Sequence, residues 1–470
     1  MQYGFVKTAA LTPSIRVADC AYNARQIIEV LRGAAAAGAE IACLPELCIT
    51  GYTCGDLFFQ PVLQQGARDA LADVLRDTAG LPLLFVLGLP LTHGGKLYNC
   101  AAVCQNGRVL GVVPKTHLPN YNEFYEKRQF TPAPAENGVI DLSGAQVPFG
   151  TNLLFQCGTQ PALTLAVEIC EDLWAPLPPS TRHAMAGATL ICNLSASDET
   201  IGKAEYRRAL VTGQSARLLC GYVYADAGEG ESTTDMVFAG HNMVAENGAL
   251  LAETAPFCGG MALTDIDVER LAGERLKNTS FPAEDNANYE VVPFVLPQNV
   301  SPLTRIVSSA PFVPADAEQR ARRCDAILAM QASGLKKRLE HTHAKTAVVG
   351  ISGGLDSCLA LLVTVRAFSL LERPLSDIVA VTMPCFGTTE RTRTNAQRLC
   401  EALGVTLQHV DITQTVRSNF ADIGQDEARH DVTYENTQAR VRTLVLMNLA
   451  NRLGGLVIGT GDLSELALGW

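Results

Sequence analysis

The sequence of 470 residues lacks the features that mark membrane-spanning or nucleic-acid-binding proteins. No apolar run reaches the roughly 18 residues that a membrane-spanning helix needs, so we expect no membrane span. Basic residues form no block and do not alternate with aromatic residues, and the formal net charge is −11. This combination argues against nucleic-acid binding. The N-terminal segment also has no basic stretch followed by an apolar core, so we expect no signal peptide.

The fifteen cysteines form no metal-binding or disulfide pattern. The sequence has no CxxC pair and no Cys/His pair at zinc spacing, and its eight histidines show no metal spacing. The cysteines are odd in number and scattered through apolar segments. Without a secretory signal, this usage predicts reduced, mostly buried thiols in a cytoplasmic enzyme. One of these thiols can still be a nucleophile.

The first ~270 residues alternate between apolar strand patterns and helical patterns, which predicts an α/β fold. The helical pattern Asp19–Ala37 has a plausible N-cap in Asp19 and a plausible stop in Gly38. The pairs Asn106-Gly107 and Asn247-Gly248 are typical of hairpin turns. The candidate strands are Phe5–Leu11, Ile41–Pro45, Leu83–Leu89, Leu97–Gln105, Val109–Pro114, Ala162–Ile169, Thr189–Leu194, Gly221–Ala225, Met236–Ala245 and Met261–Asp265.

Periodicity then fails between about Gly273 and Pro314, where proline and polar residues predict an extended connector. A second alternation follows and predicts a parallel, doubly wound sheet that binds its ligand at the carboxyl ends of the strands. We therefore expect domains at 1–272 and 315–470, joined by a linker at 273–314. The elements expected in the second domain are Ala315–Glu340, Thr346–Ile351, Cys358–Leu371, Ile378–Met383, Arg391–Leu403, Thr406–Ile412, Tyr434–Leu453 and Gly455–Gly459.

The most informative stretch of the second half is SGGLDS, which separates a β-branched run from a helical pattern. Its glycines let the backbone turn tightly, and the first amides of the helix favour an anion. Ser352 and Ser357 add hydroxyl donors, and Asp356 can hold a divalent cation against phosphate oxygens. The segment lacks the spacing and the lysine of a Walker A loop. It resembles the pyrophosphate loop of ATP pyrophosphatases, although a plain connecting turn is the alternative.

In the first half, three chemically capable residues follow ends of candidate strands: Glu46, Lys115 and Cys170. Residues just past strand carboxyl ends can converge on one site despite large sequence separations. A nearby lysine lowers the pKa of a cysteine thiol, and a carboxylate can take and return its proton. Lysine can also stabilise the oxyanion of a tetrahedral intermediate. The alternative is that Cys170 is a small core residue, which is the usual role of a cysteine at the end of a strand.

The segments around these residues, PELCITGY, PKTHLPNYNEFYEKRQF and VEICEDLW, resemble the nitrilase superfamily of amidases and glutaminases. The resemblance covers roughly Met1 to Asp267. It implies an αββα sandwich in which Glu46 is the general base, Lys115 the oxyanion stabiliser and Cys170 the nucleophile.

A nitrilase-type half followed by SGGLDS and GTGDLSELALGW resembles the glutamine-dependent NAD synthetase family. That resemblance implies that ammonia released from glutamine amidates nicotinic acid adenine dinucleotide (deamido-NAD) after ATP has adenylated its carboxylate, with Mg²⁺ offsetting phosphate charge. It also implies a homo-oligomer. Family members continue past LGW, so we expect a C-terminally incomplete domain.

Further site residues follow from the same resemblance. Tyr121, Ser197 and Lys203 match positions that hold glutamine, although arginine is expected where Lys203 stands, and lysine lacks its bidentate geometry. Asn436 matches a dinucleotide contact and Glu465 a second one. Asp356 and Glu465 match Mg²⁺ ligands. The positions matching ATP contacts are Gly350, Ile351, Ser352, Gly353, Gly354, Leu355, Asp356, Ser357 and Thr460.

Three other functions compete with this interpretation. One is a free-standing amidase with an inactive second half, and another is an assembly or regulatory subunit with vestigial sites. The third is another amidotransferase with a pyrophosphate loop, such as a GMP or asparagine synthetase. An asparagine-synthetase-type glutaminase needs cysteine at its processed N-terminus, where this sequence has Gln2.

Overall fold

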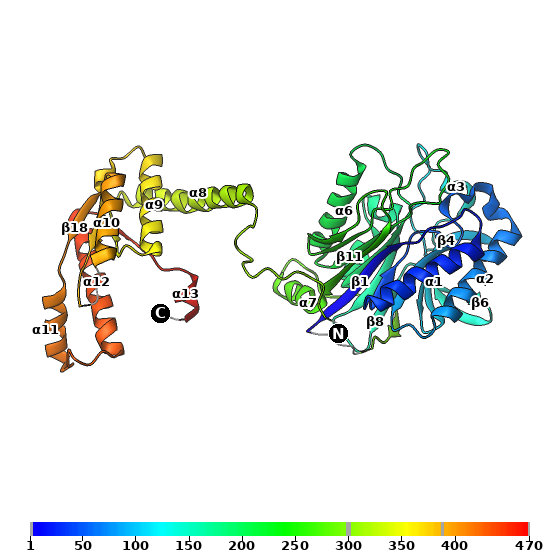
Figure 1. The fold of residues 1–470 in the computed structure, drawn as a ribbon, viewed down its shortest axis with the longest axis horizontal. Coiled ribbons are helices and arrows are strands. Elements are labelled where there is room, and N and C mark those ends of the chain that lie inside the picture. The colour runs from blue at the N-terminus through cyan, green and yellow to red at the C-terminus, as the bar shows by residue number, and fades with distance from the viewer. Residues whose placement is uncertain (1–2, 298–301, 387–389, 469–470) are drawn as a thin grey trace. The chain divides into compact units, whose positions relative to one another are not determined.

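The computed structural model describes residues 3–297, 302–386 and 390–468, without the side chains of residues 390–393 and 465. The chain divides into two compact units, Met1–Val307 and Ser308–Trp470, each with its own hydrophobic core. Figure 1 labels the elements of both units.

The first unit is built on two sheets that lie face to face. Among the described residues, one sheet has eight strands in the order β14-β1-β2-β3-β4-β5-β7-β6, and the other has seven in the order β13-β12-β11-β10-β9-β8-β15. The strands are β1 (Phe5–Thr12), β2 (Ile41–Cys43), β3 (Leu84–His93), β4 (Lys96–Gln105), β5 (Arg108–Pro114), β6 (Gly138–Leu142), β7 (Ala145–Phe149), β8 (Leu153–Cys157), β9 (Thr164–Ile169), β10 (Leu190–Ser195), β11 (Gly221–Asp226), β12 (Met243–Glu246), β13 (Ala249–Glu253), β14 (Gly260–Asp267) and β15 (Glu290–Phe294).

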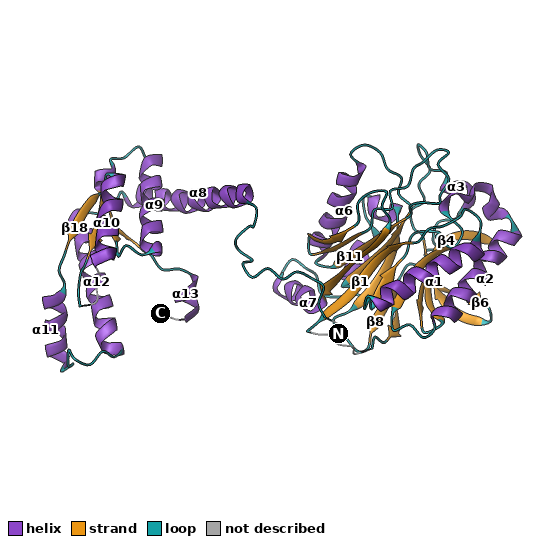
Figure 2. Ribbon diagram, in the orientation of Figure 1, coloured by secondary structure: helices purple, strands orange, loops and turns teal. Residues whose placement is uncertain are grey.

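Helices cover the outer faces of both sheets, so the layers follow the order helix, sheet, sheet, helix (Figure 2). The first sheet packs against α1 and α2, and the second packs against α5 and α6. The helices of this unit are α1 (Cys20–Ala36), η1 (Tyr52–Phe59), α2 (Pro61–Thr78), α3 (Glu126–Gln129), α4 (Glu171–Trp174), α5 (Pro179–Met185), α6 (Lys203–Leu218) and α7 (Val268–Lys277). The predicted αββα sandwich is confirmed.

Strands buried on both faces explain why the layers hold together. In β3, Leu84 and Val86 point between the sheets, while Phe85 and Leu87 point toward α1 and α2. Because successive side chains of a strand alternate between faces, one continuous apolar strand supplies two cores.

Several local predictions are confirmed. The side chain of Asp19 caps α1 by accepting from the amide of Tyr22 at 3.0 Å. Asn106 and Gly107 form the β4–β5 turn with φ values of 50° and 72°, and Asn247 and Gly248 form the β12–β13 turn with 44° and 84°. Both pairs adopt the left-handed backbone that a two-residue hairpin requires.

The expected linker at 273–314 differs from the structure. Residues Glu290–Phe294 form β15, which pairs in parallel with β8 at the edge of the second sheet. Pro293 hid this strand from pattern analysis, and an edge strand tolerates proline because its outer side needs no ladder hydrogen bond. The Asp265 carboxylate also accepts from the amides of Thr304 and Arg305, at 2.6 and 3.0 Å. Part of the expected connector therefore belongs to the first unit.

The second unit contains a parallel sheet in the order β18-β17-β16-β19. The strand order reverses between β16 and β19, so segments that follow these two strands leave the sheet side by side. Ligands of doubly wound folds bind at this switch point. The elements are α8 (Ala317–Thr342), β16 (Ala347–Gly350), α9 (Leu355–Leu370), η2 (Leu375–Asp377), β17 (Ile378–Thr382), α10 (Glu390–Leu403), β18 (Thr406–His409), α11 (Thr413–Ile423), α12 (Val432–Leu453), β19 (Leu456–Ile458) and α13 (Leu463–Leu468).

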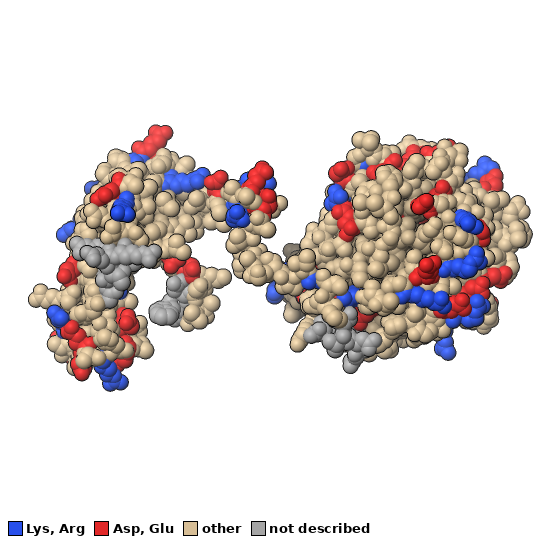
Figure 3. Space-filling view, in the orientation of Figure 1, with Lys and Arg blue, Asp and Glu red and all other residues tan. Residues whose placement is uncertain are grey.

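Acidic and basic side chains are interspersed on the face of the first unit that Figure 3 shows. In the described part of the chain, no helix has the length and apolar character needed to cross a membrane.

Candidate active site

The sandwich brings Glu46, Lys115 and Cys170 together in the interior of the first unit. Glu46 follows β2 and Lys115 follows β5, both in the first sheet, whereas Cys170 follows β9 in the second sheet. All three side chains are buried, with exposures of 1%, 0% and 6%. Their convergence requires the two sheets to pack face to face, which no sequence spacing specifies.

Lys115 lies between two carboxylates. Its Nζ atom donates to Glu46 Oε1 and to Glu126 Oε1, both at 2.6 Å. Asn99 Nδ2 also donates to Glu46 Oε1 at 2.6 Å. The other oxygen of Glu46 accepts from the amide of Ala196 at 3.0 Å. Glu46 is therefore held from both sheets.

Charge balance governs this cluster. Burial lowers the pKa of Lys115, but the carboxylates of Glu126 and Glu46 outweigh that effect and raise it well above its ordinary value. Lys115 is therefore a cation at neutral pH. Removing Lys115 would leave buried carboxylates without a compensating charge, which costs about 3–5 kcal/mol.

The sequence analysis did not identify Glu126. This residue is 4% exposed and begins the short helix α3, where its carboxylate also accepts from the Tyr52 hydroxyl at 2.8 Å. Burial raises the pKa of Glu126 to about 7, with Lys115 lowering it and Glu46 raising it. The segment between Lys115 and Glu126 forms no helix or strand, so no periodic pattern joins the two residues, and only the folded path of the chain brings them together.

Cys170 adopts an unusual backbone conformation, with φ 46° and ψ −99°. A non-glycine residue there carries strain that the surroundings must offset. Burial raises the pKa of the Cys170 thiol well above its ordinary value and Glu46 adds to the increase, while Lys115 lowers it. The thiol is therefore protonated at rest. It becomes a nucleophile only when a neighbouring base takes its proton.

A cavity of about 540 Å³ opens onto Cys170. All three predicted glutamine-binding residues, Tyr121, Ser197 and Lys203, line it together with Glu171. Tyr121 donates to Glu171 Oε1 at 2.8 Å. Carboxylate and ammonium groups thus stand in the same cavity as the thiol.

The Lys203 ammonium pairs with the Asp198 carboxylate and lies 5.6 and 5.5 Å from the ring centroids of Phe124 and Trp174. Ser197 is 2% exposed, and its hydroxyl accepts from Arg207 at 3.1 Å. The sequence analysis had singled out none of the partners in these contacts.

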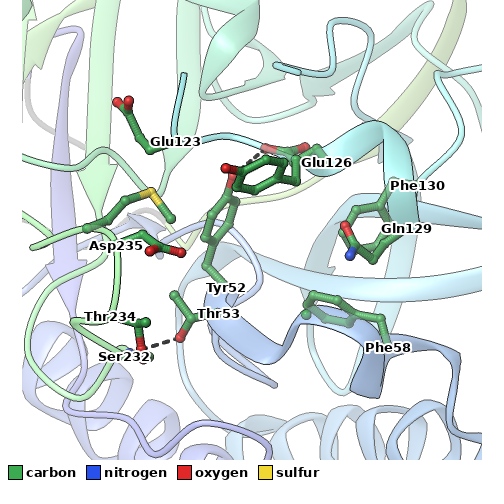
Figure 4. A pocket seen from close by; sticks show the side chains of 13 residues that line it. Tyr52, Thr53, Phe58, Glu123, Glu126, Gln129, Phe130, Ser232, Thr234 and Asp235 are labelled. Carbon is green, nitrogen blue, oxygen red and sulfur yellow. Dashed lines mark hydrogen bonds between the residues drawn. The ribbon is translucent and has the colours of Figure 1, made fainter. Parts of the chain in front are cut away.

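A second hollow, of about 290 Å³, reaches the cluster from the side of Glu126. Figure 4 shows the Tyr52 and Glu126 side chains pointing toward each other, with Phe58 and Phe130 nearby and Asp235 opposite. The Phe58 and Phe130 rings pack at a centroid distance of 4.9 Å. One hollow borders Cys170 and the other borders Glu126, and Glu123 lines both.

In the second unit, the SGGLDS segment forms a closed turn between β16 and α9. Ser352 and Ser357 hydroxyls lie 3.2 Å apart, and Ser352 Oγ accepts from the Gly354 amide at 3.2 Å. Gly353 has φ 80°, a conformation that favours glycine. The first amides of α9 have no acceptor within their own helix. The turn, which runs from Gly350 and Ile351 to Leu355 and beyond, thus presents amides and hydroxyls of the kind that bind phosphate oxygens.

The other predicted nucleotide residues lie at varying distances from this turn. Thr460 is exposed just past β19, the parallel neighbour of β16, and Asp356 is exposed in the first turn of α9. Asn436 is half-buried near the start of α12, roughly 15 Å along the helix from Leu446, which borders Gly350. The side chain of Glu465 lies outside the described residues.

Comparison with known proteins accounts for both units. A carbon-nitrogen hydrolase family model matches residues 7–275, and an NAD synthase family model matches residues 327–470. The chain is 45% identical to the glutamine-dependent NAD(+) synthetase of Mycobacterium tuberculosis over 485 residues, covering 100% of this chain and 71% of that protein. This chain belongs to the glutamine-dependent NAD(+) synthetase family.

Other members of the family are also similar. The Mycobacterium leprae synthetase is 44% identical to this chain, and the matched region spans 99% of this chain and 71% of the Mycobacterium leprae protein. A solved structure of the Acinetobacter baumannii synthetase in complex with adenosine diphosphate matches with a TM-score of 0.48 at 26% identity. It covers 99% of this chain, which covers 76% of that one.

Proposed function

We propose that this protein is a glutamine-hydrolysing NAD(+) synthetase. It amidates deamido-NAD to NAD(+) in an ATP-dependent reaction, takes ammonia from glutamine, and releases AMP and pyrophosphate. Residues 1–272 carry the glutaminase and residues 315–470 the ligase. The observation that carries the proposal is the buried Lys115, held 2.6 Å from both Glu46 and Glu126 beside the thiol of Cys170.

In the proposed glutaminase reaction, Glu46 takes the proton of Cys170 and the sulfur attacks the glutamine carboxamide. Lys115 stabilises the oxyanion, and the proton held by Glu46 passes to the departing ammonia. Water then attacks the thioester carbon while Glu46 takes its proton. The carbon–sulfur bond breaks, the proton passes from Glu46 to the Cys170 sulfur, and glutamate leaves. The raised pKa of the thiol supports this order, because a protonated nucleophile needs an adjacent base.

Glutamine recognition follows from the charges in the cavity that opens onto Cys170. We assign the substrate's α-carboxylate to Lys203 and Ser197, and its α-ammonium to Glu171, which Tyr121 orients. Lys203 offers one charged nitrogen rather than the two-pronged guanidinium of arginine, and it is already paired with Asp198. A lysine so engaged holds a carboxylate less tightly than a free bidentate arginine does.

For the ligase, we assign ATP phosphates to the turn from Gly350 to Ser357 and to Thr460, because amides and hydroxyls are suited to phosphate oxygens. Asp356 would hold Mg²⁺, and its exposed carboxylate fits an oxygen-seeking cation. Mg²⁺ would neutralise phosphate charge during adenylation. Glu465 as a second ligand, Asn436 and Glu465 as dinucleotide contacts, and assembly into a homo-oligomer remain proposals from the family resemblance.

The decisive substitution is Cys170→Ala. We expect glutamine hydrolysis to fall to background, while NAD(+) formation from added ammonia continues, because only the first route needs a thioester. Both rates are measured with deamido-NAD, ATP and Mg²⁺ present. Cys192→Ala is the matched control, because Cys192 is a fully buried cysteine of β10. Glutaminase activity at the parental rate in Cys170→Ala would refute the assignment.

The same assays separate this proposal from a free-standing amidase. An amidase would hydrolyse glutamine steadily and form no ATP-dependent product. The match of residues 327–470 to the NAD synthase family favours the ligase.

A further inference from the structure

A buried polar chain lies behind Cys170, on the opposite side of the second sheet from the catalytic cluster. Glu168, Asn193 and Tyr222 occupy the neighbouring strands β9, β10 and β11, and their exposures are 1%, 0% and 0%. Glu168 and Asn193 are register partners, so their side chains share a face. The apolar neighbours of Asn193 in the strand, Cys192 and Leu194, point the other way, between the sheets.

Asn193 makes contacts with the main chain of the nucleophile and with the next strand end. Its Oδ1 atom accepts from the amide of Cys170 at 3.2 Å and from the hydroxyl of Ser195 at 2.7 Å, which occupies both lone pairs. The carbonyl of Ser195 in turn accepts from the amide of Glu46 at 3.3 Å. One carboxamide oxygen thus joins the main chain of Cys170 to the strand end that supports Glu46.

The other end of the carboxamide is anchored. Asn193 Nδ2 donates to the Tyr222 hydroxyl at 3.1 Å, and that hydroxyl donates to Glu168 Oε1. The second oxygen of Glu168 accepts from the amide of Ser180 at 2.8 Å. Every group of this chain has a partner, so the orientation of the Asn193 carboxamide is set from both sides.

We propose that Asn193 is a positioning residue for the nucleophile, held through Tyr222 by the buried carboxyl of Glu168. It keeps the main chain of Cys170 at φ 46°, a conformation in which the thiol meets the Glu46–Lys115 pair. The proposal rests on the role of Cys170 given above. A strained residue relaxes when its restraint is removed, and a small displacement of a reacting atom reduces rate by on the order of 10²-fold.

The test is Asn193→Ala in the full chain. We expect kcat for glutamine hydrolysis to fall on the order of 10²-fold, with KM within about threefold, because Tyr121, Ser197 and Lys203 lie outside this network. Alkylation of Cys170 by iodoacetamide, followed by mass spectrometry of its peptide, should slow in parallel. Asn23→Ala is the matched control, because Asn23 is a fully buried asparagine with hydrogen bonds to Arg16 and Ile49.

A purely structural Asn193 would make both asparagine variants less stable to urea, while kcat per folded molecule and the alkylation rate stayed at parental values in both. That outcome overturns the proposal. If Asn193→Ala yields no folded protein, Tyr222→Phe decides, because it removes one hydroxyl and keeps the ring. A fall in kcat of about fivefold or more at constant KM supports the anchor, and a parental kcat overturns it.

Cys170→Ala distinguishes failure of this proposal from failure of the proposed function. If that variant retains glutaminase activity, the nucleophile assignment itself is wrong. If it is inactive while Asn193→Ala and Tyr222→Phe behave like Asn23→Ala, only the positioning role is wrong.

Discussion

At the scale of single residues, the proposed active site holds several ionisable side chains in a buried position. Lys115 stands between two carboxylates, with every side chain of the group at most 4% exposed. Two acidic side chains and one cation cannot all be charged there without an excess negative charge, and burial raises the pKa of Glu126 to about 7. The charge of Glu126 is therefore coupled to the charges of Lys115 and Glu46.

Glu126→Gln tests this coupling through pH dependence. In the parent, burial raises the pKa of Glu126 to about 7, so this carboxyl is protonated below that pH and charged above it. We expect kcat/KM for glutamine to rise with pH through that value, because the charged Glu126 carboxylate holds the Lys115 ammonium that stabilises the oxyanion. Glutamine at position 126 removes one titrating group. We expect a lower maximal rate and no acid limb near pH 7, so the variant-to-parent ratio increases as the pH falls from about 8 to about 6. Asp235→Asn, at another carboxyl that borders the same hollow but not the Cys170 cavity, is the control. An unchanged acid limb in Glu126→Gln would contradict the coupling.

At the scale of elements, the position of Glu46 depends on how closely a loop can pass over a strand. A Cβ atom built on Gly88 in β3 would lie 2.2 Å from the Leu47 amide nitrogen and 2.6 Å from the Pro45 carbonyl oxygen. Only glycine leaves space for this main chain. The loop that carries Glu46 therefore rests directly on β3.

Gly88→Ala should push that loop away from the strand. We expect the free energy of unfolding to fall by about 1–3 kcal/mol and kcat for glutamine hydrolysis to fall about tenfold or more, because Glu46 moves from its partners. Urea denaturation and steady-state kinetics measure the two effects.

Gly33→Ala is the control for this substitution. In the described part of the chain, a Cβ on Gly33 meets no heavy atom within 4 Å beyond its own helix backbone and chain neighbours. Alanine there should stabilise α1 by roughly 0.5–1 kcal/mol and leave kcat unchanged. Equal behaviour of the two variants would show that the close approach at Gly88 has no consequence.

At the scale of the whole molecule, the two chemistries belong to separate folding units. The cores of Met1–Val307 and Ser308–Trp470 consist of different residues. The Cys170 cavity lies wholly in the first unit and the SGGLDS turn wholly in the second. A substitution in one site should therefore leave the local chemistry of the other intact.

Asp356→Ala tests this independence. By calorimetric titration, we expect Mg·ATP to bind about tenfold or more weakly, while ATP without Mg²⁺ binds as before, because the substitution removes a ligand of the ion. Glutaminase kcat without ATP should match the parent. Asp422→Ala, at an exposed residue of α11, is the control. If the Mg²⁺ dependence of ATP binding survives in Asp356→Ala, this carboxylate is not a metal ligand.

Local sequence patterns were sufficient to predict many of the strands, helices and turns of this protein. Neighbouring residues alone indicate the strand ends before Glu46, Lys115 and Cys170. They also indicate the hairpin turns at Asn106 and Asn247 and the alternation of strands and helices in both units. Side-chain periodicity and turn preference act over a few positions, so they can be recognised in one dimension. Edge strand β15 was missed because a proline within a strand is acceptable only in a particular sheet position.

Tertiary structure alone decided the partners of those residues. Glu126 reaches Lys115 from the start of α3, Asn193 accepts from the amide of Cys170 from the next strand, and Asp198 pairs with the ammonium of Lys203. The raised pKa of the Cys170 thiol also depends on burial between two sheets. Hydrogen bonds and desolvation act through space, and the distances that govern them exist only after the sheets have packed.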